Sequence, residues 1–138
     1  MNDFPFGAEH VRVYQETGGD EGYRWRKGTT ILLLTTIGRK SGEPRTMPLI
    51  YADDDGRAVI VASKGGAPEH PAWYLNMQDN PEVEVQIKSE KFTARPRDAE
   101  GEERERLWEL MVGEWPDYAK YQQKTDREIP VVILERAG

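Results

Sequence analysis

One turn-forming segment contains most of the residues in the sequence that are suited to binding an anion. The run Gly38-Arg39-Lys40-Ser41-Gly42 supplies two cations, a hydroxyl and two flexible residues, and Arg45 adds a third cation nearby. Backbone N–H groups exposed in such a turn form a concave site for phosphate or carboxylate oxygens. The spacing matches neither a P-loop nor a dinucleotide-binding fingerprint. The alternative interpretation is a charged hairpin tip without a ligand.

A second candidate segment follows a predicted strand. Ser63-Lys64-Gly65-Gly66 comes directly after a β-rich run, and its glycine pair lets the backbone approach a ligand closely. Ser63 has no evident His and Asp partners, so the sequence disfavours a hydrolase triad. A hydrogen bond from Ser63 to a ligand and a plain turn role both remain open. His70 is interpreted as a cap or satisfied loop residue, with general-base catalysis as the alternative.

Aromatic residues near the C-terminus form a third candidate. Trp115, Tyr118 and Tyr121 recur every three residues, so a helix would present them on one side. A phenol can donate a hydrogen bond or proton to a carbonyl or nitro oxygen during reduction. The competing interpretation is an amphipathic core face. The following segment, residues 124–128, is interpreted as a solvated turn without chemistry.

Composition and charge narrow the class of ligand. The chain of 138 residues has 19 Lys+Arg and 25 Asp+Glu, a formal charge of −6. Residues 24–45 hold six basic residues against one acidic residue, 6 − 1 = +5, so the remainder carries −11. A local basic patch on an acidic protein suits a small anionic ligand and disfavours nucleic acid. The chain has no Cys and only two His, which disfavours disulfides, thiolate catalysis and a metal site.

Length and hydropathy predict one cytoplasmic domain covering residues 1–138. The longest apolar run is far shorter than the roughly 20 residues that span a bilayer, and the N-terminus has no secretory pattern. Phe4 and Phe6 are expected to pack on the domain. A weak association with the inner membrane surface through these two residues is the alternative.

Periodicity and turn residues predict about six strands and four helices, without βαβ alternation. Strands that are grouped in this way favour an α+β protein with an antiparallel sheet or small barrel over a Rossmann fold. Asp98 is expected to cap the third helix, in which Glu102 pairs with Arg106, and Leu107, Leu110 and Met111 form the apolar stripe. The predicted strands are residues 31–37, 46–51, 57–63, 82–87, 91–96 and 131–134, and the predicted helices are 8–17, 70–79, 98–114 and 116–123.

Several ordered motifs together resemble the deazaflavin-dependent nitroreductase family, the F420H2-dependent quinone and nitroimidazole reductases of actinobacteria. The resemblance covers roughly residues 25–135. Its motifs are Leu34-Thr35-Thr36-Ile37-Gly38-Arg39-Lys40-Ser41-Gly42-Glu43-Pro44-Arg45, Ala62-Ser63-Lys64-Gly65-Gly66, Pro71-Ala72-Trp73-Tyr74-Leu75-Asn76, Asn80-Pro81, Trp115-Pro116-Asp117-Tyr118 with Tyr121, and Thr125-Asp126-Arg127.

The resemblance implies a split β-barrel akin to that of FMN-binding reductases, with coenzyme F420 held in a groove. Its phospholactyl-polyglutamate tail would meet the basic turn and Lys64, and Tyr118 would close over the deazaflavin ring. Asn76 is also an awkward core residue, which independently suggests a ligand contact. The implied cofactor-binding residues are Arg39, Lys40, Ser41, Arg45, Thr46, Met47, Pro48, Leu49, Ile50, Val61, Ala62, Ser63, Lys64, Ala72, Trp73, Tyr74, Leu75, Asn76 and Tyr118.

The implied reaction is hydride transfer from reduced F420 to an electron-poor acceptor such as a quinone, enone or nitroaromatic. Ser63 and Tyr118 are the expected catalytic hydrogen-bonding groups, and Trp115, Tyr118 and Tyr121 the expected acceptor-binding groups. The nitroimidazole-activating member of the family has tyrosine where Trp115 and Ile50 stand here, so quinone or enone reduction is the stronger expectation. An FMN-binding reductase and a non-catalytic F420 carrier are the alternatives, and the oligomeric state is open.

Overall fold

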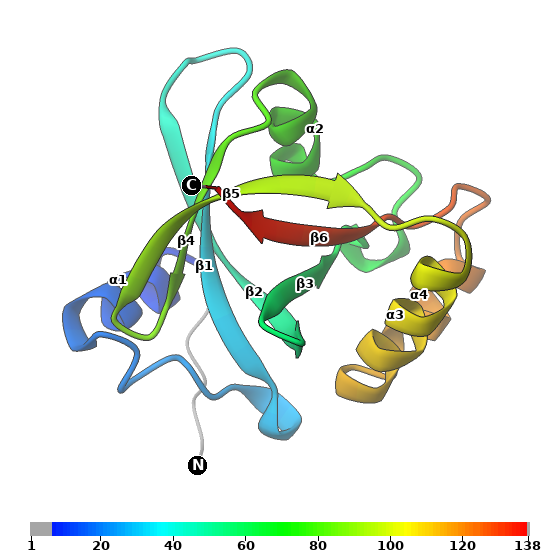
Figure 1. Ribbon diagram of the computed structural model, residues 1–138, viewed down its shortest axis with the longest axis horizontal. Helices are drawn as coiled ribbons and strands as arrows, with labels where there is room; N and C mark the ends of the chain where they lie inside the picture. Colours follow the sequence, from blue (N-terminus) through cyan, green and yellow to red (C-terminus); the bar gives the residue numbers. More distant parts are fainter. Residues whose placement is uncertain (1–6, 138) are drawn as a thin grey trace.

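The structure is a computed structural model that describes residues 7–137, and the predicted packing of Phe4 and Phe6 lies outside these residues. Six strands form a closed barrel in the order β1-β2-β3-β6-β5-β4, with every neighbouring pair antiparallel (Figure 1). The predicted α+β class and small antiparallel barrel are confirmed. The strands are β1 (Thr30–Ile37), β2 (Pro44–Asp54), β3 (Arg57–Val61), β4 (Val83–Ile87), β5 (Glu90–Asp98) and β6 (Val131–Arg136).

Four α-helices and two short 3-10 turns surround the barrel in the described part of the chain. Figure 1 shows α2 beside one end of the barrel and α3 with α4 together on one flank. The elements are α1 (Gly7–Thr17), α2 (Ala72–Asp79), α3 (Gly101–Glu114), α4 (Asp117–Gln123), η1 (Arg26–Gly28) and η2 (Lys64–Gly66).

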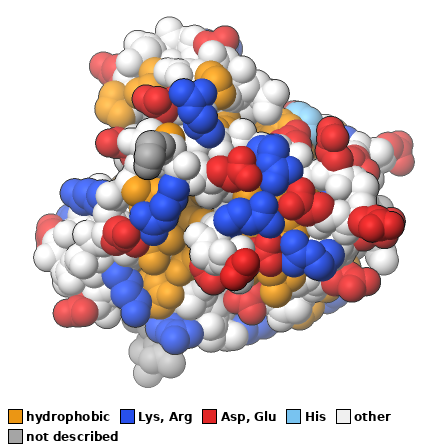
Figure 2. Space-filling view, viewed as in Figure 1, with side chains coloured by type: hydrophobic (Ala, Val, Ile, Leu, Met, Phe, Trp, Pro, Cys, Tyr) orange, Lys and Arg blue, Asp and Glu red, His pale blue; other side chains and the backbone are white. Residues whose placement is uncertain are grey.

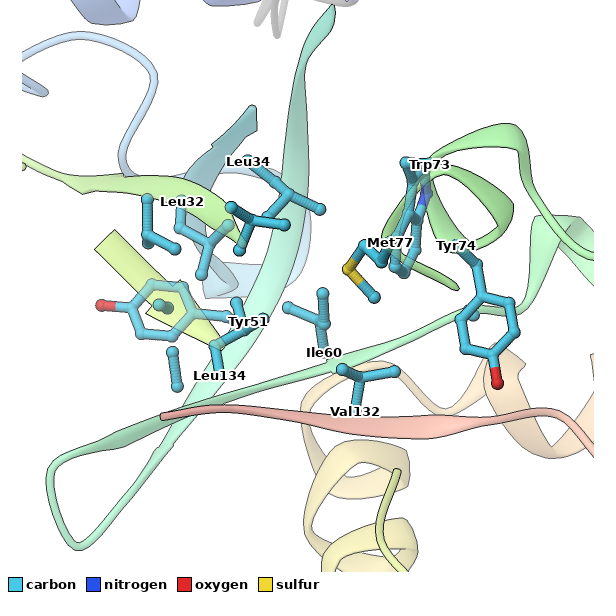
Figure 3. Close-up of a cluster of buried hydrophobic side chains, with 14 residues drawn as sticks. Leu32, Leu34, Tyr51, Ile60, Trp73, Tyr74, Met77, Val132 and Leu134 are labelled. Atoms are coloured by element: carbon cyan, nitrogen blue, oxygen red, sulfur yellow. The ribbon is translucent and has the colours of Figure 1, made fainter. Parts of the chain in front are cut away.

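Alternating side chains of the strands fill the barrel interior. Leu32 and Leu34 from β1 and Ile60 from β3 are fully buried in this cluster, and α2 adds Trp73 and Met77 from one end. Figure 3 shows these two α2 side chains pointing toward Ile60. The alternation expected for residues 82–87 is seen on the inner face, where Val83, Val85 and Ile87 belong to the same cluster. On the outer face the expectation fails for Gln86, which is buried and donates to the Lys88 carbonyl oxygen. The period of two in these strands therefore builds the core.

The apolar runs of β1 and β6 are continuous because both faces of these strands are covered. Outside the barrel, Ile31 and Leu33 pack with Tyr14 of α1. On the opposite flank, Leu107 and Met111 of α3 cover the outer face of β6 and are fully buried. Helices on the outer faces thus explain why these strands do not alternate between apolar and polar residues.

The structure around α3 corrects three sequence expectations. Arg106 binds Asp54 at 2.7 Å instead of pairing with Glu102, and it holds the pKa of Asp54 at about 2. Asp98 ends β5 and accepts a hydrogen bond from Tyr74, whereas α3 begins at Gly101. Leu110 is exposed because it lies outside the buried stripe of α3. Figure 2 shows basic and acidic side chains interleaved over this region.

No helix in residues 7–137 is long and apolar enough to cross a membrane. The same residues contain no group of three or more His, Asp or Glu side chains that could hold a metal ion.

Candidate functional site

Two pockets adjoin on one side of the barrel and share part of their lining. One is mainly apolar, with a volume of about 550 Å³, and the other is basic, with a volume of about 560 Å³. Met47 of β2 and Ala72 and Trp73 of α2 line both pockets. The two pockets therefore form one elongated groove with an aromatic end and a cationic end.

The β1–β2 hairpin builds the basic pocket. Its ends are joined by a hydrogen bond from the Gly38 N–H to the Glu43 carbonyl at 2.8 Å, as the predicted turn requires. A Cβ atom at Gly38 would lie 2.6 Å from Ser41 Oγ and 3.3 Å from the Glu43 carbonyl oxygen, so a larger residue here would displace the Ser41 side chain. Ser41 Oγ accepts a hydrogen bond from Arg45 at 3.4 Å. The hairpin thus presents Arg39, Lys40 and Arg45 at one pocket, where they can bind anions.

Asn76 ties this hairpin to α2. Its Oδ1 accepts hydrogen bonds from the backbone N–H of Arg39 at 3.1 Å and from the Arg39 guanidinium at 3.2 Å. Its Nδ2 donates to the buried Thr36 hydroxyl at 3.1 Å. The side chain lines the basic pocket and is buried, and its amide is satisfied within the protein. Asn76 therefore positions Arg39, and its predicted contact with a ligand stays a prediction.

The loop after β3 forms one wall of the apolar pocket. Ser63 is 9% exposed, and Lys64 takes a left-handed φ of 47°, which is strained for a residue with a side chain. At Gly66, φ is 85° and a Cβ atom would lie 2.7 Å from the Tyr121 carbonyl oxygen. The loop can therefore pack directly on α4 only because residue 66 is glycine.

Arg127 fastens the same loop from the opposite side. Its guanidinium donates to the carbonyl oxygens of Ser63 at 2.8 Å and Ala67 at 2.9 Å, and more weakly to Ala62 at 3.3 Å. It also lies 3.0 Å from His70 Nδ1, which must accept because a guanidinium only donates. The interpretation of residues 124–128 as a solvated turn without a specific role was wrong for Arg127.

Aromatic side chains form a further part of the wall of the apolar pocket. Tyr118 of α4 is 6% exposed and meets Tyr121 edge to face at 6.1 Å between ring centroids. Trp115 lies at the end of α3, outside α4, and its Nε1 donates to the Tyr121 hydroxyl at 3.4 Å. The three side chains line the apolar pocket together, as their spacing predicts, although they do not share one helix.

Two residues that line this pocket carry hydroxyl groups without hydrogen-bond partners. Among the described residues, neither Ser63 Oγ nor the Tyr118 hydroxyl makes a hydrogen bond, and no buried side-chain N or O atom is both unpartnered and shut off from solvent. Burial, followed by the nearby Tyr121, raises the pKa of Tyr118, which keeps its hydroxyl protonated at neutral pH. Both groups can therefore donate hydrogen bonds to a ligand in an apolar surrounding.

The structure brings together most of the residues predicted to form the site. Ala62, Tyr74 and Leu75 line neither pocket, and the first two belong to the core. The apolar pocket is lined by the predicted residues Met47, Pro48, Leu49, Ile50, Val61, Ser63, Lys64, Ala72, Trp73, Trp115, Tyr118 and Tyr121, and the basic pocket by Arg39, Lys40, Ser41, Arg45, Thr46, Met47, Ala72, Trp73 and Asn76.

Sequence reasoning missed the contribution of the N-terminal segment to the apolar pocket. Trp25 lies 5.8 Å from Trp115 between ring centroids, and His10 stacks on Trp25 at 6.4 Å. The only feature of the sequence that could have indicated this contribution was Trp25, which lies within the basic stretch of residues 24–27. The periodicity of α1 shows that one face of the helix is buried, but it does not show which part of the protein that face covers. The pocket-lining residues missed are Gly7, His10, Trp25, Ile31, Gly65 and Pro71.

Comparison with known proteins gives a family match over nearly the whole chain. Residues 7–136 match the family model described as F420H(2)-dependent quinone reductase. An F420H(2)-dependent quinone reductase of Mycobacterium tuberculosis is 41% identical over 130 residues, which are 92% of this chain and 87% of the relative.

Solved structures show the same similarity. A structure of an F420-H2 dependent reductase has 50% identity and a TM-score of 0.70, with 76% of this chain and 93% of that chain covered. A structure described as a domain-swapped dimer has 44% identity and a TM-score of 0.73, with 91% and 96% covered. A Listeria innocua protein assigned as a pyridoxamine 5′-phosphate oxidase has 13% identity and a TM-score of 0.55 over 93% and 90%, a likeness of fold that confirms the split barrel.

Proposed function

Because the chain belongs to the F420H(2)-dependent quinone reductase family, whose cofactor is reduced F420, we propose that this single-domain oxidoreductase transfers a hydride to a quinone-like acceptor in the apolar pocket. The observation that carries the proposal is the continuity of the two pockets through Met47, Ala72 and Trp73. An elongated cofactor with a planar ring and an anionic tail needs such a groove, with apolar walls at one end and cations at the other.

The residues present fit F420. Arg39, Lys40 and Arg45 would bind the phosphate and carboxylates of the tail, because they carry positive charge at the basic pocket of an otherwise acidic protein. The strand segment 48–50 and Trp73 would hold the ring between apolar surfaces. When bound, reduced F420 supplies the hydride, and the protein supplies orientation and a dry environment.

The chain's own polar groups would act on the acceptor. Ser63 and Tyr118 line the pocket and carry unpartnered hydroxyls, and the raised pKa of Tyr118 keeps it a donor. A hydrogen bond from either group to a quinone carbonyl oxygen would withdraw electron density from the ring and stabilise the negative charge that hydride addition creates. Trp115 and Tyr121 would exclude water and fix the plane of the acceptor.

Titration with oxidised F420, followed by fluorescence polarisation, tests the cofactor site, with FMN titrated in parallel. Lys40→Ala is the sharper variant, because Lys40 is exposed and makes no hydrogen bond or ion pair among the described residues, whereas Arg39 is bonded to Asn76. We expect Lys40→Ala to weaken F420 binding about three- to tenfold. Lys120→Ala is the matched control, because Lys120 is exposed on α4 and lines neither pocket.

Substitution Tyr118→Phe tests the catalytic role. The variant keeps the ring and loses only the hydroxyl, so F420 affinity is expected to stay unchanged while quinone reduction falls about 10- to 100-fold. Tyr121→Phe is the comparison, because its hydroxyl already accepts from Trp115. Preference for FMN over F420 would overturn the cofactor assignment, and F420 binding without any quinone reduction would instead support a carrier.

A further inference from the structure

His10 of α1 is a buried polar side chain at the apolar pocket that the proposed reaction does not use. It is 2% exposed and lines the pocket together with Trp25 and Trp115. None of these three residues lines the basic pocket, so they belong to the part of the groove away from the predicted cofactor tail. Burying a polar ring in an apolar wall costs free energy unless its nitrogens form hydrogen bonds, so the partners of both ring nitrogens matter.

One edge of the imidazole is fixed by the protein. His10 Nε2 lies 2.7 Å from the carbonyl oxygen of Gly22, and because a carbonyl only accepts, Nε2 carries the hydrogen. A Cβ atom at Gly22 would lie 3.0 Å from His10 Cδ2, so glycine allows the ring to approach this closely. Trp25 stacks on the ring at an interplanar angle of 27°. These contacts set both the tautomer and the orientation of the ring.

The other ring nitrogen is available to a ligand. With hydrogen on Nε2, Nδ1 of the neutral ring is a hydrogen-bond acceptor. Within residues 7–137 it has no partner, and no buried side-chain nitrogen or oxygen there is both unpartnered and inaccessible. Because His10 lines the apolar pocket, Nδ1 has its access there.

We propose that His10 Nδ1 accepts a hydrogen bond from an aromatic hydroxyl group bound in the apolar pocket, as in a phenol or hydroquinone. The inference rests on the proposed function for the role of such a ligand, since a hydroquinone is the reduced form of a quinone. Ser63 and Tyr118 can donate to a carbonyl oxygen and can also accept from an O–H group, whereas Nδ1 only accepts and therefore selects an O–H group. The pocket thus carries donors for the oxidised acceptor and a distinct partner for the reduced product.

The two histidines of the chain allow a direct test by NMR on the full-length protein labelled with ¹⁵N and ¹³C in histidine. The probe is 1-naphthol, and the matched ligand is 1-methylnaphthalene, which replaces the hydroxyl by a methyl group of similar size. We expect 1-naphthol to shift the His10 Nδ1 resonance and 1-methylnaphthalene to leave it nearly unchanged. His70 is the internal control, because its Nδ1 already accepts from Arg127.

A variant measures the strength of the contact by calorimetry. His10→Phe keeps an aromatic ring and removes both ring nitrogens, so it also loses the bond to Gly22, and the comparison of the two ligands isolates the Nδ1 contact. The 1-naphthol affinity is expected to fall about fivefold, the effect of one hydrogen bond, with 1-methylnaphthalene affinity unchanged. His70→Asn is the control variant and is expected to leave both affinities unchanged. If His10→Phe does not fold, the resonances of the unaltered protein decide the question alone.

The outcomes separate this inference from the proposed function, because neither measurement uses F420. Binding of 1-naphthol without a change at His10 Nδ1, an equal response to both ligands, or no binding of 1-naphthol would overturn the inference. If the protein reduces quinones but the His10 Nδ1 resonance does not shift with 1-naphthol, the proposed function stands and the role of His10 is refuted. A clear Nδ1 response in a protein that neither binds F420 nor reduces quinones would support the hydroxyl site and refute the reductase.

Discussion

Replacing Arg127 by Met is predicted to loosen the pocket wall from a position outside the pocket. Arg127 lines neither pocket, yet its guanidinium bonds to the carbonyl oxygens of Ser63 and Ala67 and to His70. Methionine has a similar length and no donor. The substitution therefore removes the fastening of the loop after β3 while keeping much of the apolar contact of the side chain.

The expected loss of stability follows from these contacts. The bonds to Ser63 and Ala67 are short and charge-assisted, and each contributes about 1–1.5 kcal/mol in a partly buried position. The Ser63 carbonyl retains a second donor, the Gly66 N–H at 3.0 Å, which limits the penalty of leaving it unpaired. The total is about 2–3 kcal/mol, which for a domain of this size lowers Tm by roughly 6–12 °C.

Urea and thermal unfolding followed by tryptophan fluorescence measure this loss. Arg12→Met is the matched control, because Arg12 also donates to several oxygens, those of Glu9 and Glu16, but at an exposed surface position where the change is expected to be within error. Arg127→Lys keeps the charge without the planar fork and is expected to fall between the parent and the Met variant. An Arg127→Met protein that unfolds at the same urea concentration as the parent would refute the reasoning.

Two further predictions concern the same loop. Gly66→Ala combines a left-handed φ with a Cβ atom 2.7 Å from the Tyr121 carbonyl oxygen. It is therefore expected to destabilise the protein by about 1–3 kcal/mol and to lower the rate of quinone reduction. Gly56→Ala shares only the backbone strain and is the control in both measurements. Burial, and next the Arg127 charge, lower the pKa of His70, so the unfolded chain takes up the proton first as pH falls. Neutral His70 therefore contributes to the free energy of unfolding above about pH 6.5. This contribution is lost as the pH falls from there through the lower pKa of His70 in the folded state. Chemical denaturation between pH 5 and 7.5 should therefore show a smaller pH dependence for His70→Asn than for the parent, and equal slopes would contradict the assignment.

The fold was largely readable from local pattern. Alternation and turn residues located the six strands and four helices within a few residues, because β hairpins and amphipathic faces leave short-range signals. Closure of the barrel was not locally encoded. The β1–β4 contact joins Leu34 to Val85 across 50 intervening residues, and such pairing depends on the shape of the whole sheet.

The errors in local contacts have a common physical origin. Arg106 and Asp98 were assigned to partners close in sequence, whereas the structure gives them partners on other elements, Asp54 and Tyr74. Helical spacing and capping rules describe an isolated helix, and tertiary neighbours compete for the same charged groups. Arg127 was overlooked for the same reason, because its three carbonyl partners lie 60 or more positions away in the chain.

The positions of the two candidate catalytic hydroxyls depend on contacts that lie outside the pocket. Ser63 belongs to a loop fastened by Arg127, and Tyr118 belongs to a helix whose end packs on Gly66 of that loop. Both side chains are thus held through the same piece of backbone. A catalytic pair needs its groups placed within a fraction of an ångström, so the spacing between these hydroxyls is governed by residues that never touch a ligand. Changes at Arg127 or Gly66 should therefore reduce turnover more than they weaken F420 binding, because the basic hairpin proposed to bind the tail is built separately and is anchored by Asn76.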